Sequence, residues 1–91
     1  MKQIIGYTTG VFDLFHIGHL NILRESKKMC DKLIVGITTD ELVYKRKNKY
    51  PVIPFRERIE IVNAIKYVDK TALQNTMDKM VAWEKFKKSF R

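Results

Sequence analysis

Apolar residues follow two different spacings along the chain, and these spacings predict alternating strands and helices. Residues 3–8 are mostly β-branched or aromatic and stop short of Gly10, which predicts a buried strand. Between residues 17 and 29, apolar side chains recur every three or four positions opposite charged ones, which predicts an amphipathic helix. Residues 32–38 form a nearly continuous apolar run, which is typical of a parallel strand covered on both faces. This order predicts a βαβ unit.

The alternation continues after the second strand. Asp40 is expected to cap a short helix over residues 40–44, and residues 45–49 are expected to form a basic loop. Pro54 suits the first position of a further helix, and its apolar stripe is Phe55, Ile59, Val62 and Ile65.

The C-terminal part is expected to hold a third strand and a last helix. Residues 68–73 favour the strand, and Thr76 is expected to cap a helix that ends near Lys88. The apolar residues of this helix lie on more than one face, so part of its surface is expected to need a partner, and they are Met77, Met80, Val81, Trp83, Phe86 and Phe90.

Length and composition limit what the chain can be. Its 91 residues, 45% of them apolar, predict one domain over residues 1–91 with a small core. Eighteen basic against ten acidic residues give a net charge of +8, which favours an anionic partner. Cys30 is the single cysteine, so no internal disulfide can form, and a cytoplasmic location is expected. No apolar run reaches membrane-spanning length.

The richest chemistry lies where the first strand meets the first helix. The turn at Gly10 directs backbone N–H groups and the positive helix end to one point, as α/β folds do when they bind phosphate. His16 and His19 lie three positions apart and therefore share a helix face, and Gly18 between them adds no side chain. Two other interpretations stay open on spacing alone: a metal site with Asp13 as third ligand, and incidental polar residues at a helix start.

The pattern Gly10-x-Phe12-Asp13-x-x-His16-x-Gly18-His19 resembles the signature of the cytidylyltransferase family of nucleotidyltransferases. Segments after the second strand and around residues 57–69 resemble the family in the same order, so the likeness covers roughly residues 3–80. Glycerol-3-phosphate cytidylyltransferases resemble the chain most. Two groups of adenylyltransferases in the superfamily usually carry proline where this chain has Leu14, so the resemblance favours CTP as the donor.

The resemblance implies a three-layer Rossmann-like α/β fold with a parallel sheet, and a reaction in which a substrate phosphate oxygen attacks the α-phosphorus of CTP. Pyrophosphate leaves, Mg²⁺ shares the charge, and no side chain is implied as a ligand to the metal. The second substrate is expected to be a small phosphate ester such as glycerol 3-phosphate. His16 and His19 are the implied catalytic residues. The implied nucleotide-binding residues are Gly10, Val11, Phe12, Asp13, His16, Ile17, Gly18, His19, Lys49 and Arg58.

Three basic positions receive roles by the same resemblance. Lys47 is expected to bind the substrate phosphate and Lys49 the CTP, although charge alone would favour a solvated loop. Lys79, in the expected last helix, aligns with a further substrate-binding lysine only if a gap is allowed.

Family members continue past this point with another strand and an Arg-Thr-x-Gly-x-Ser-Thr-Thr segment, which occurs nowhere in these 91 residues. The chain is therefore expected to be a fold shortened after its βαβαβα portion. Two hypotheses follow: a cytidylyltransferase, expected to be a homodimer, and a non-catalytic nucleotide-binding or assembly module. Nucleic-acid binding is disfavoured, because the lysines gather in one short loop without interleaved aromatic residues.

Overall fold

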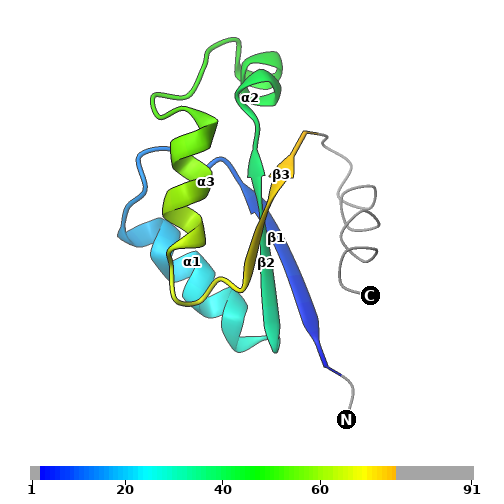
Figure 1. The fold of residues 1–91 in the computed structure, drawn as a ribbon. Helices are drawn as coiled ribbons and strands as arrows, with labels where there is room; N and C mark the ends of the chain where they lie inside the picture. Colours follow the sequence, from blue (N-terminus) through cyan, green and yellow to red (C-terminus); the bar gives the residue numbers. More distant parts are fainter. Residues whose placement is uncertain (1–2, 76–91) are drawn as a thin grey trace.

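The computed structural model describes residues 3–75, which form three parallel strands and three helices (Figure 1). Strand β1 (Ile5–Gly10) pairs with β2 (Lys32–Thr38), and β2 pairs with β3 (Lys70–Gln74), so β2 is the central strand. The register places Gly10 beside Ile37 at the carboxyl end of the sheet. A parallel, Rossmann-like α/β sheet, as the sequence predicts, is therefore confirmed.

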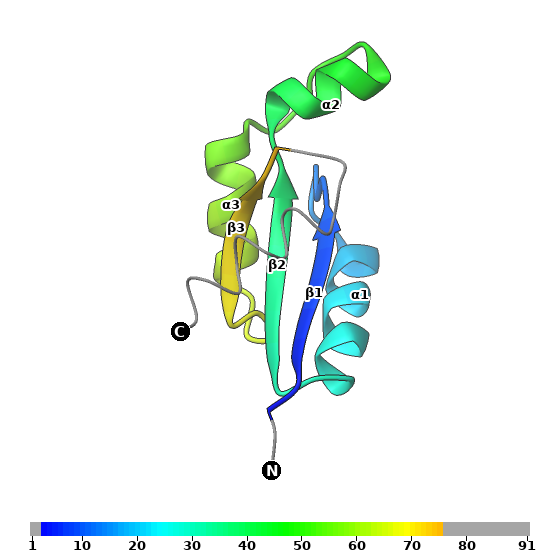
Figure 2. The same cartoon turned by 90° about the vertical axis from the view of Figure 1, so that its right-hand side faces the viewer.

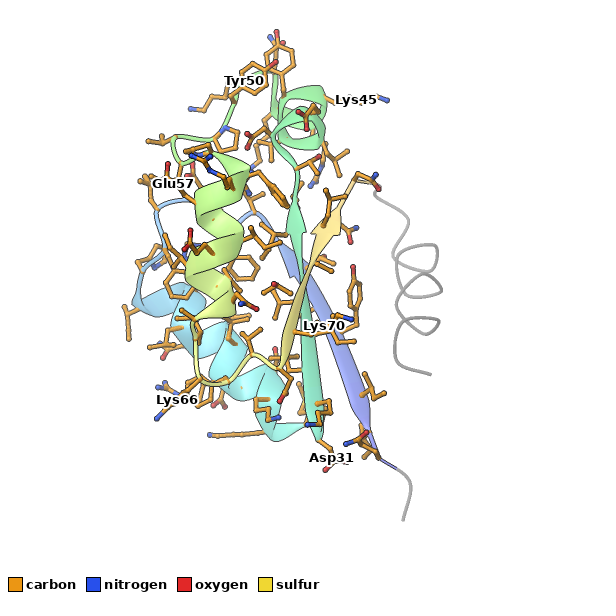
Figure 3. The ribbon with its side chains drawn as sticks, viewed as in Figure 1. Asp31, Lys45, Tyr50, Glu57, Lys66 and Lys70 are labelled. Carbon is orange, nitrogen blue, oxygen red and sulfur yellow. The ribbon has the colours of Figure 1, made fainter. Side chains whose placement is uncertain are left out.

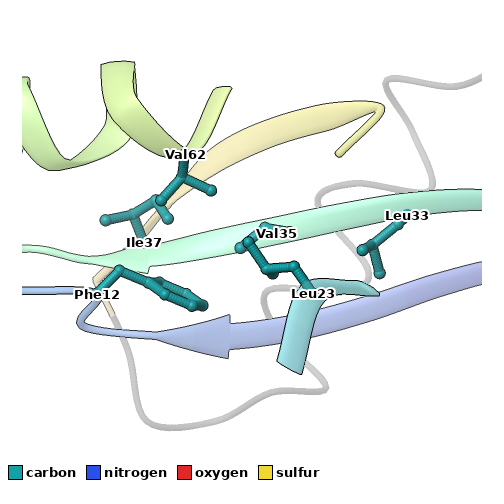
Figure 4. Close-up of a cluster of buried hydrophobic side chains, with 6 residues drawn as sticks. All are labelled: Phe12, Leu23, Leu33, Val35, Ile37 and Val62. Carbon is teal, nitrogen blue, oxygen red and sulfur yellow. The ribbon is translucent and has the colours of Figure 1, made fainter. Parts of the chain in front are cut away.

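Two helices cover the same face of this sheet. Helix α1 (Ile17–Lys28) follows β1, and α3 (Phe55–Asn63) precedes β3; Figure 2 views the sheet from the side opposite to both. Alternate residues of β2 point toward the helices and are fully or almost fully buried. The resulting core, drawn in Figure 4, consists of Phe12, Leu23, Leu33, Val35, Ile37 and Val62.

Helix α2 (Asp40–Lys47) lies beyond the carboxyl end of β2 and differs from the expected helix in both its cap and its length. The cap is Thr39, whose side chain accepts a hydrogen bond from the N–H of Leu42, and not Asp40. The helix extends through the first three residues of the expected basic loop, to Lys47, because lysine and arginine are good helix formers and are favoured in a last turn. Asn48, in the left-handed conformation, ends it.

Smaller corrections concern the other boundaries. The first strand begins and ends two residues later than residues 3–8, and the third strand occupies Lys70–Gln74 instead of 68–73. Pro54 is the N-cap of α3 and not its first residue, and Ile65 lies beyond the helix while still packing on the core. The expected last helix, with Thr76 and Lys79, lies outside the described residues.

Candidate functional site

The turn between β1 and α1 contains two residues with left-handed backbones. Phe12 has φ 53° and Leu14 has φ 50°, a conformation that few residues other than glycine adopt. Phe12 fixes the turn because its ring is buried in the core, whereas Leu14 is 56% exposed. Backbone strain of this kind is concentrated at functional sites in proteins.

The two histidines of the motif cap helix α1 together. The Nδ1 atom of His16 accepts a hydrogen bond from the Gly18 N–H, and Nδ1 of His19 accepts one from the His16 N–H, each at 3.0 Å. This is a capping box built from two imidazoles. Because the capping bonds fix both rings, the centroids lie only 4.0 Å apart.

These hydrogen bonds also fix where the protons lie. Since both Nδ1 atoms accept, each neutral ring carries its proton on Nε2, which can donate to an anion. Burial, assisted by the charge of the adjacent His16, lowers the pKa of His19, and Asp13 offsets this only in part. His19 is therefore a neutral hydrogen-bond donor at pH 7.

Asp13 joins the turn to the segment after α2. Its carboxylate accepts hydrogen bonds from the backbone N–H groups of Val52 and Ile53, both at 2.8 Å. Burial opposes ionisation, but these two bonds and the charge of Arg58 outweigh it and hold the pKa of Asp13 below its usual value. In this arrangement Asp13 positions a loop.

Arg58, on α3, also connects the β1–α1 turn to the segment after α2. Its side chain is fully buried, and Nη1 donates to the carbonyl oxygens of Val11 and Thr38 at 2.7 and 2.8 Å. Nε donates to the carbonyl of Ile53 at 2.8 Å, and Nη2 donates to the Asp40 carboxylate. The expected contact between Arg58 and a nucleotide stays a prediction; the contacts seen here hold the loops of the site together.

A cavity of about 510 Å³ opens beside the histidines, between the β1–α1 turn and the segment that includes the end of α2. Seven of the expected site residues line it: Gly10, Val11, Phe12, Asp13, His19, Lys47 and Lys49. Three others, His16, Ile17 and Gly18, form the adjoining start of α1, and Arg58 lies buried behind the turn. Lys79 lies outside the described residues.

The sequence interpretation missed the aromatic part of this site. Tyr44 and Tyr50 stack with ring centroids 4.6 Å apart and an interplanar angle of 24°, and Tyr50 lines the cavity. Residues 45–49 themselves contain no aromatic residue, as the sequence shows, but the two tyrosines flank them. The signal was present, because the two tyrosines bracket the lysines of residues 45–49.

The described residues 3–75 offer neither a cluster of metal ligands nor a membrane-spanning helix. No group of three histidine, cysteine, aspartate or glutamate side chains gathers there as metal ligands would. Within the same residues, no helix has both the length and the apolar character needed to cross a bilayer.

Comparison with known proteins agrees with this geometry. The family model "Cytidylyltransferase-like" matches residues 7–88, nearly the whole chain. The chain belongs to the cytidylyltransferase-like family. A solved structure, that of the lipopolysaccharide core biosynthesis protein from Thermoplasma volcanium GSS1, matches this family member with a TM-score of 0.82. The two are 32% identical, and the match covers 92% of this chain and 68% of the other.

Curated relatives of this cytidylyltransferase-like chain include archaeal FAD synthases. Those of Pyrococcus abyssi and Pyrococcus horikoshii are each 44% identical over 73 residues, and that of Thermococcus kodakarensis is 39% identical over 69. The matches cover 76–80% of this chain, but the chain spans about half the length of these relatives, 46–47%. The expected closeness to glycerol-3-phosphate cytidylyltransferases stays a prediction.

Proposed function

We propose that the site transfers a nucleotidyl group from a nucleoside triphosphate to a phosphate monoester, with release of pyrophosphate. The observation that carries the proposal is the interlocked pair His16 and His19 at the N-terminus of α1, beside a cavity that two lysines also line. Two fixed imidazole donors and a helix N-terminus suit an anion better than a neutral ligand. Family membership supports the same reaction class.

In the proposed reaction, an oxygen of the acceptor phosphate attacks the α-phosphorus of the triphosphate. The bond from the α-phosphorus to the bridging oxygen breaks, and pyrophosphate leaves with that oxygen and the electron pair. No protein nucleophile takes part, so the protein contributes positioning and stabilisation of negative charge. The Nε2–H groups of His16 and His19 supply that stabilisation, because their Nδ1 atoms are held by backbone N–H groups.

The two lysines that line the cavity are assigned to different phosphate groups. Following the family alignment, Lys47 binds the acceptor phosphate and Lys49 binds the triphosphate; both line the cavity, which supports their assignment to one site. Each ammonium acts as a flexible point charge, so the lysines favour binding of phosphate groups without fixing their orientation as an arginine would. Lys79 keeps its expected role at the acceptor phosphate as a proposal.

Mg²⁺, expected from the family resemblance, has no ready ligand set among residues 3–75. Among the described residues, the carboxylate that lines the cavity is that of Asp13, and both of its oxygens already accept backbone N–H groups. Residues 3–75 therefore do not fit a protein-held metal, and no step of the proposed reaction is assigned to the ion.

The donor nucleotide has two candidates. CTP is favoured by the resemblance that includes Leu14, with glycerol 3-phosphate as the expected acceptor. ATP is the second candidate, because FAD, named in the curated relatives, contains an adenylyl group. A flavin phosphate would then be the acceptor.

Pyrophosphate release tests the proposal. CTP and ATP are each supplied with glycerol 3-phosphate or flavin mononucleotide, and at least one pair should release pyrophosphate. His16→Ala and His19→Ala should each lower the rate by roughly 10²–10³-fold, as loss of a charge-stabilising donor does. Lys28→Ala, at the far end of α1 in an exposed ion pair with Glu25, is the control and should keep the wild-type rate.

An unchanged rate in both histidine variants contradicts the proposed site. Absence of pyrophosphate release from every pair contradicts the reaction, and calorimetry showing nucleotide binding alone would favour the non-catalytic module. Sedimentation of the same sample measures whether the chain forms the expected homodimer.

A further inference from the structure

The end of helix α2 and the residues just after it form a continuous exposed stretch. Helix α2 packs on the rest of the fold through its buried residues Leu42 and Val43, whereas every residue from 44 to 50 is exposed. Residues 44–50 make up the α2 terminal segment. Four of its seven side chains are cations and none is an acid; the cations are Lys45, Arg46, Lys47 and Lys49.

These cations have no carboxylate partner within the described part of the chain. The ion pairs found there involve Lys27, Lys28 and Arg58, and none involves residues 45–49. The negative end of the helix dipole favours cations, which accounts for positive charge in the last turn of α2. It does not account for Lys49, which lies beyond the helix. A row of like charges without partners instead favours a polyanion.

Two tyrosine rings meet beside these charges. Asn48 takes the left-handed conformation at φ 58°, and its N–H donates to the Tyr44 carbonyl at 2.7 Å, so the chain turns at the end of α2. The turn brings Tyr50 onto Tyr44, with ring centroids 4.6 Å apart and 24° between the ring planes. Tyr50 and Tyr44 are nevertheless 62% and 43% exposed. A ring pair that is stacked and still exposed offers its outer faces to another flat ring.

Part of the α2 terminal segment lies outside the cavity beside the histidines. Tyr44, Lys45 and Arg46 are not among the residues that line this cavity. Because Lys45, Arg46 and Lys47 are consecutive in a helix, their side chains project in three directions around its last turn. Figure 3 shows Lys45 extending away from Tyr50 at the carboxyl end of the sheet. The positive charge therefore continues around the end of α2, beyond a site for one nucleotide.

We propose that the α2 terminal segment binds single-stranded nucleic acid, with phosphates against Lys45 and Arg46 and a base on the stacked pair of Tyr44 and Tyr50. Cations beside exposed aromatic rings match a single strand, in which each nucleotide carries one phosphate and one flat base. The charges alone would also suit an anionic membrane, whereas a stacked ring pair favours a flat ligand. The sequence disfavoured nucleic acid because residues 45–49 lack aromatic residues, but the turn at Asn48 brings the flanking rings together.

Fluorescence anisotropy of the full chain with a labelled oligothymidylate of about twelve nucleotides tests the contribution of charge. The logarithm of the association constant should fall with the logarithm of salt concentration with a slope of about −3, because each neutralised phosphate of a single strand contributes about −0.7. Lys45→Ala/Arg46→Ala should reduce the slope to about −1.5 and weaken binding at least tenfold at low salt.

A matched double variant separates local contacts from net charge. Lys32→Ala/Lys66→Ala removes the same charge from two exposed side chains; Lys32 begins β2, and Figure 3 shows Lys66 far from Lys45. This variant should weaken binding less than about twofold, because salt screens charges at that distance. Equal weakening in the two double variants would mean that net charge alone drives binding, and it would overturn the inference.

A second comparison tests the contribution of the bases. Tyr44→Leu removes the ring that does not line the cavity and should weaken oligothymidylate binding roughly fivefold, as loss of base stacking does, whereas Tyr44→Phe should bind as wild type does. An abasic strand of the same length should bind roughly fivefold more weakly than oligothymidylate and should not respond to Tyr44→Leu. Equal affinity for the two strands would overturn the inference, because phosphate alone would then be recognised.

Vesicles of phosphatidylglycerol and phosphatidylcholine test the membrane alternative. Vesicle binding that depends on Lys45 and Arg46, without binding of the oligothymidylate, would overturn the inference in favour of a lipid surface. Binding of the oligothymidylate that depends on Tyr44, Lys45 and Arg46 would support it. None of these measurements requires nucleotidyl transfer, so this inference and the proposed function can fail separately.

Discussion

The Arg58 guanidinium donates to the Asp40 carboxylate at 2.5 Å, with the arginine side chain fully buried and the aspartate side chain 29% exposed. Asp40 uses its other oxygen to accept the Phe55 N–H at 3.2 Å. The pair thereby joins the start of α2 to the start of α3. Because Arg58 also binds the Val11 carbonyl, the position of the β1–α1 turn depends on this pair.

Arg58→Met should unfold more easily than wild type, by about 3 kcal/mol, because it leaves three backbone carbonyls and a carboxylate without their donor. Asp40→Asn keeps an acceptor oxygen beside the guanidinium and should cost less, about 1–2 kcal/mol. Urea denaturation measures both. An Arg58→Met protein of wild-type stability that binds nucleotide poorly would instead favour direct contact of Arg58 with the nucleotide.

Asp13 should make the attachment of its loop sensitive to acid. Folding lowers the pKa of this carboxyl, so the folded state binds fewer protons than the unfolded state. Its contribution to the free energy of unfolding is complete above an unfolded pKa of about 3.9 and is lost as the pH falls through the lower folded value.

Asp13→Asn should be less stable than wild type at pH 7 by about 2 kcal/mol, since the amide can accept only one of the two N–H groups with its oxygen. The difference should shrink below pH 4. The pKa of Asp69 is also lowered, chiefly by the hydrogen bond from Lys27. Because wild type and Asp13→Asn both contain Asp69, its effect does not contribute to the difference in stability between them. Glu60→Gln, an exposed change on α3, is the control, and a pH-independent difference for Asp13→Asn would contradict the prediction.

The spacing of apolar residues predicted the elements in which one face is buried at the regular period of a helix or strand. Helix α1 and strand β2 lie almost where the sequence places them, because Leu23 and residues 33, 35 and 37 pack on one another at the spacings of a helix and a strand. The spacing of His16 and His19 alone is compatible with a phosphate site, a metal site or incidental polar residues. The family resemblance favours the phosphate site.

What could not be predicted depends on contacts between distant segments. From apolar spacing alone, Arg58 is one of several basic residues in an amphipathic helix. Its side chain is buried because three backbone carbonyls from other parts of the chain accept its hydrogen bonds. Asp40 looked like a cap, but its carboxylate is used by α3, so Thr39 caps α2 instead. Tyr50 lines the cavity because of the path of the loop after α2, which the apolar pattern of the sequence does not indicate.

The His19 imidazole should titrate at a pKa below 6.5, because burial and the charge of His16 both disfavour its protonated form. A lowered folded pKa means that stability from this group is complete above pH 6.5 and falls as the pH drops toward the folded value. Protonation would also add a hydrogen to Nδ1, which now accepts the His16 N–H.

NMR titration of the imidazole protons measures this pKa. His16→Asn removes the neighbouring charge while keeping an acceptor for the Gly18 N–H, so it should raise the pKa of His19 part of the way toward 6.5. A His19 pKa above 6.5 would contradict the lowering by burial and by His16, and a pKa unmoved by His16→Asn would show that the two rings have no electrostatic coupling.

Gly18→Ala should separate stability from activity. A Cβ at this position would lie 2.7 Å from Cε1 and 3.0 Å from Nδ1 of His16, so the imidazole must move. Alanine favours the helix by about 0.5–1 kcal/mol, while the lost cap costs about 1 kcal/mol, so the free energy of unfolding should change little. Pyrophosphate release should nevertheless fall at least tenfold, because one phosphate donor is displaced. Ser26→Ala, in the same helix but away from the cap, should leave the rate unchanged, and wild-type activity in Gly18→Ala would mean that the observed position of His16 is not needed for the reaction.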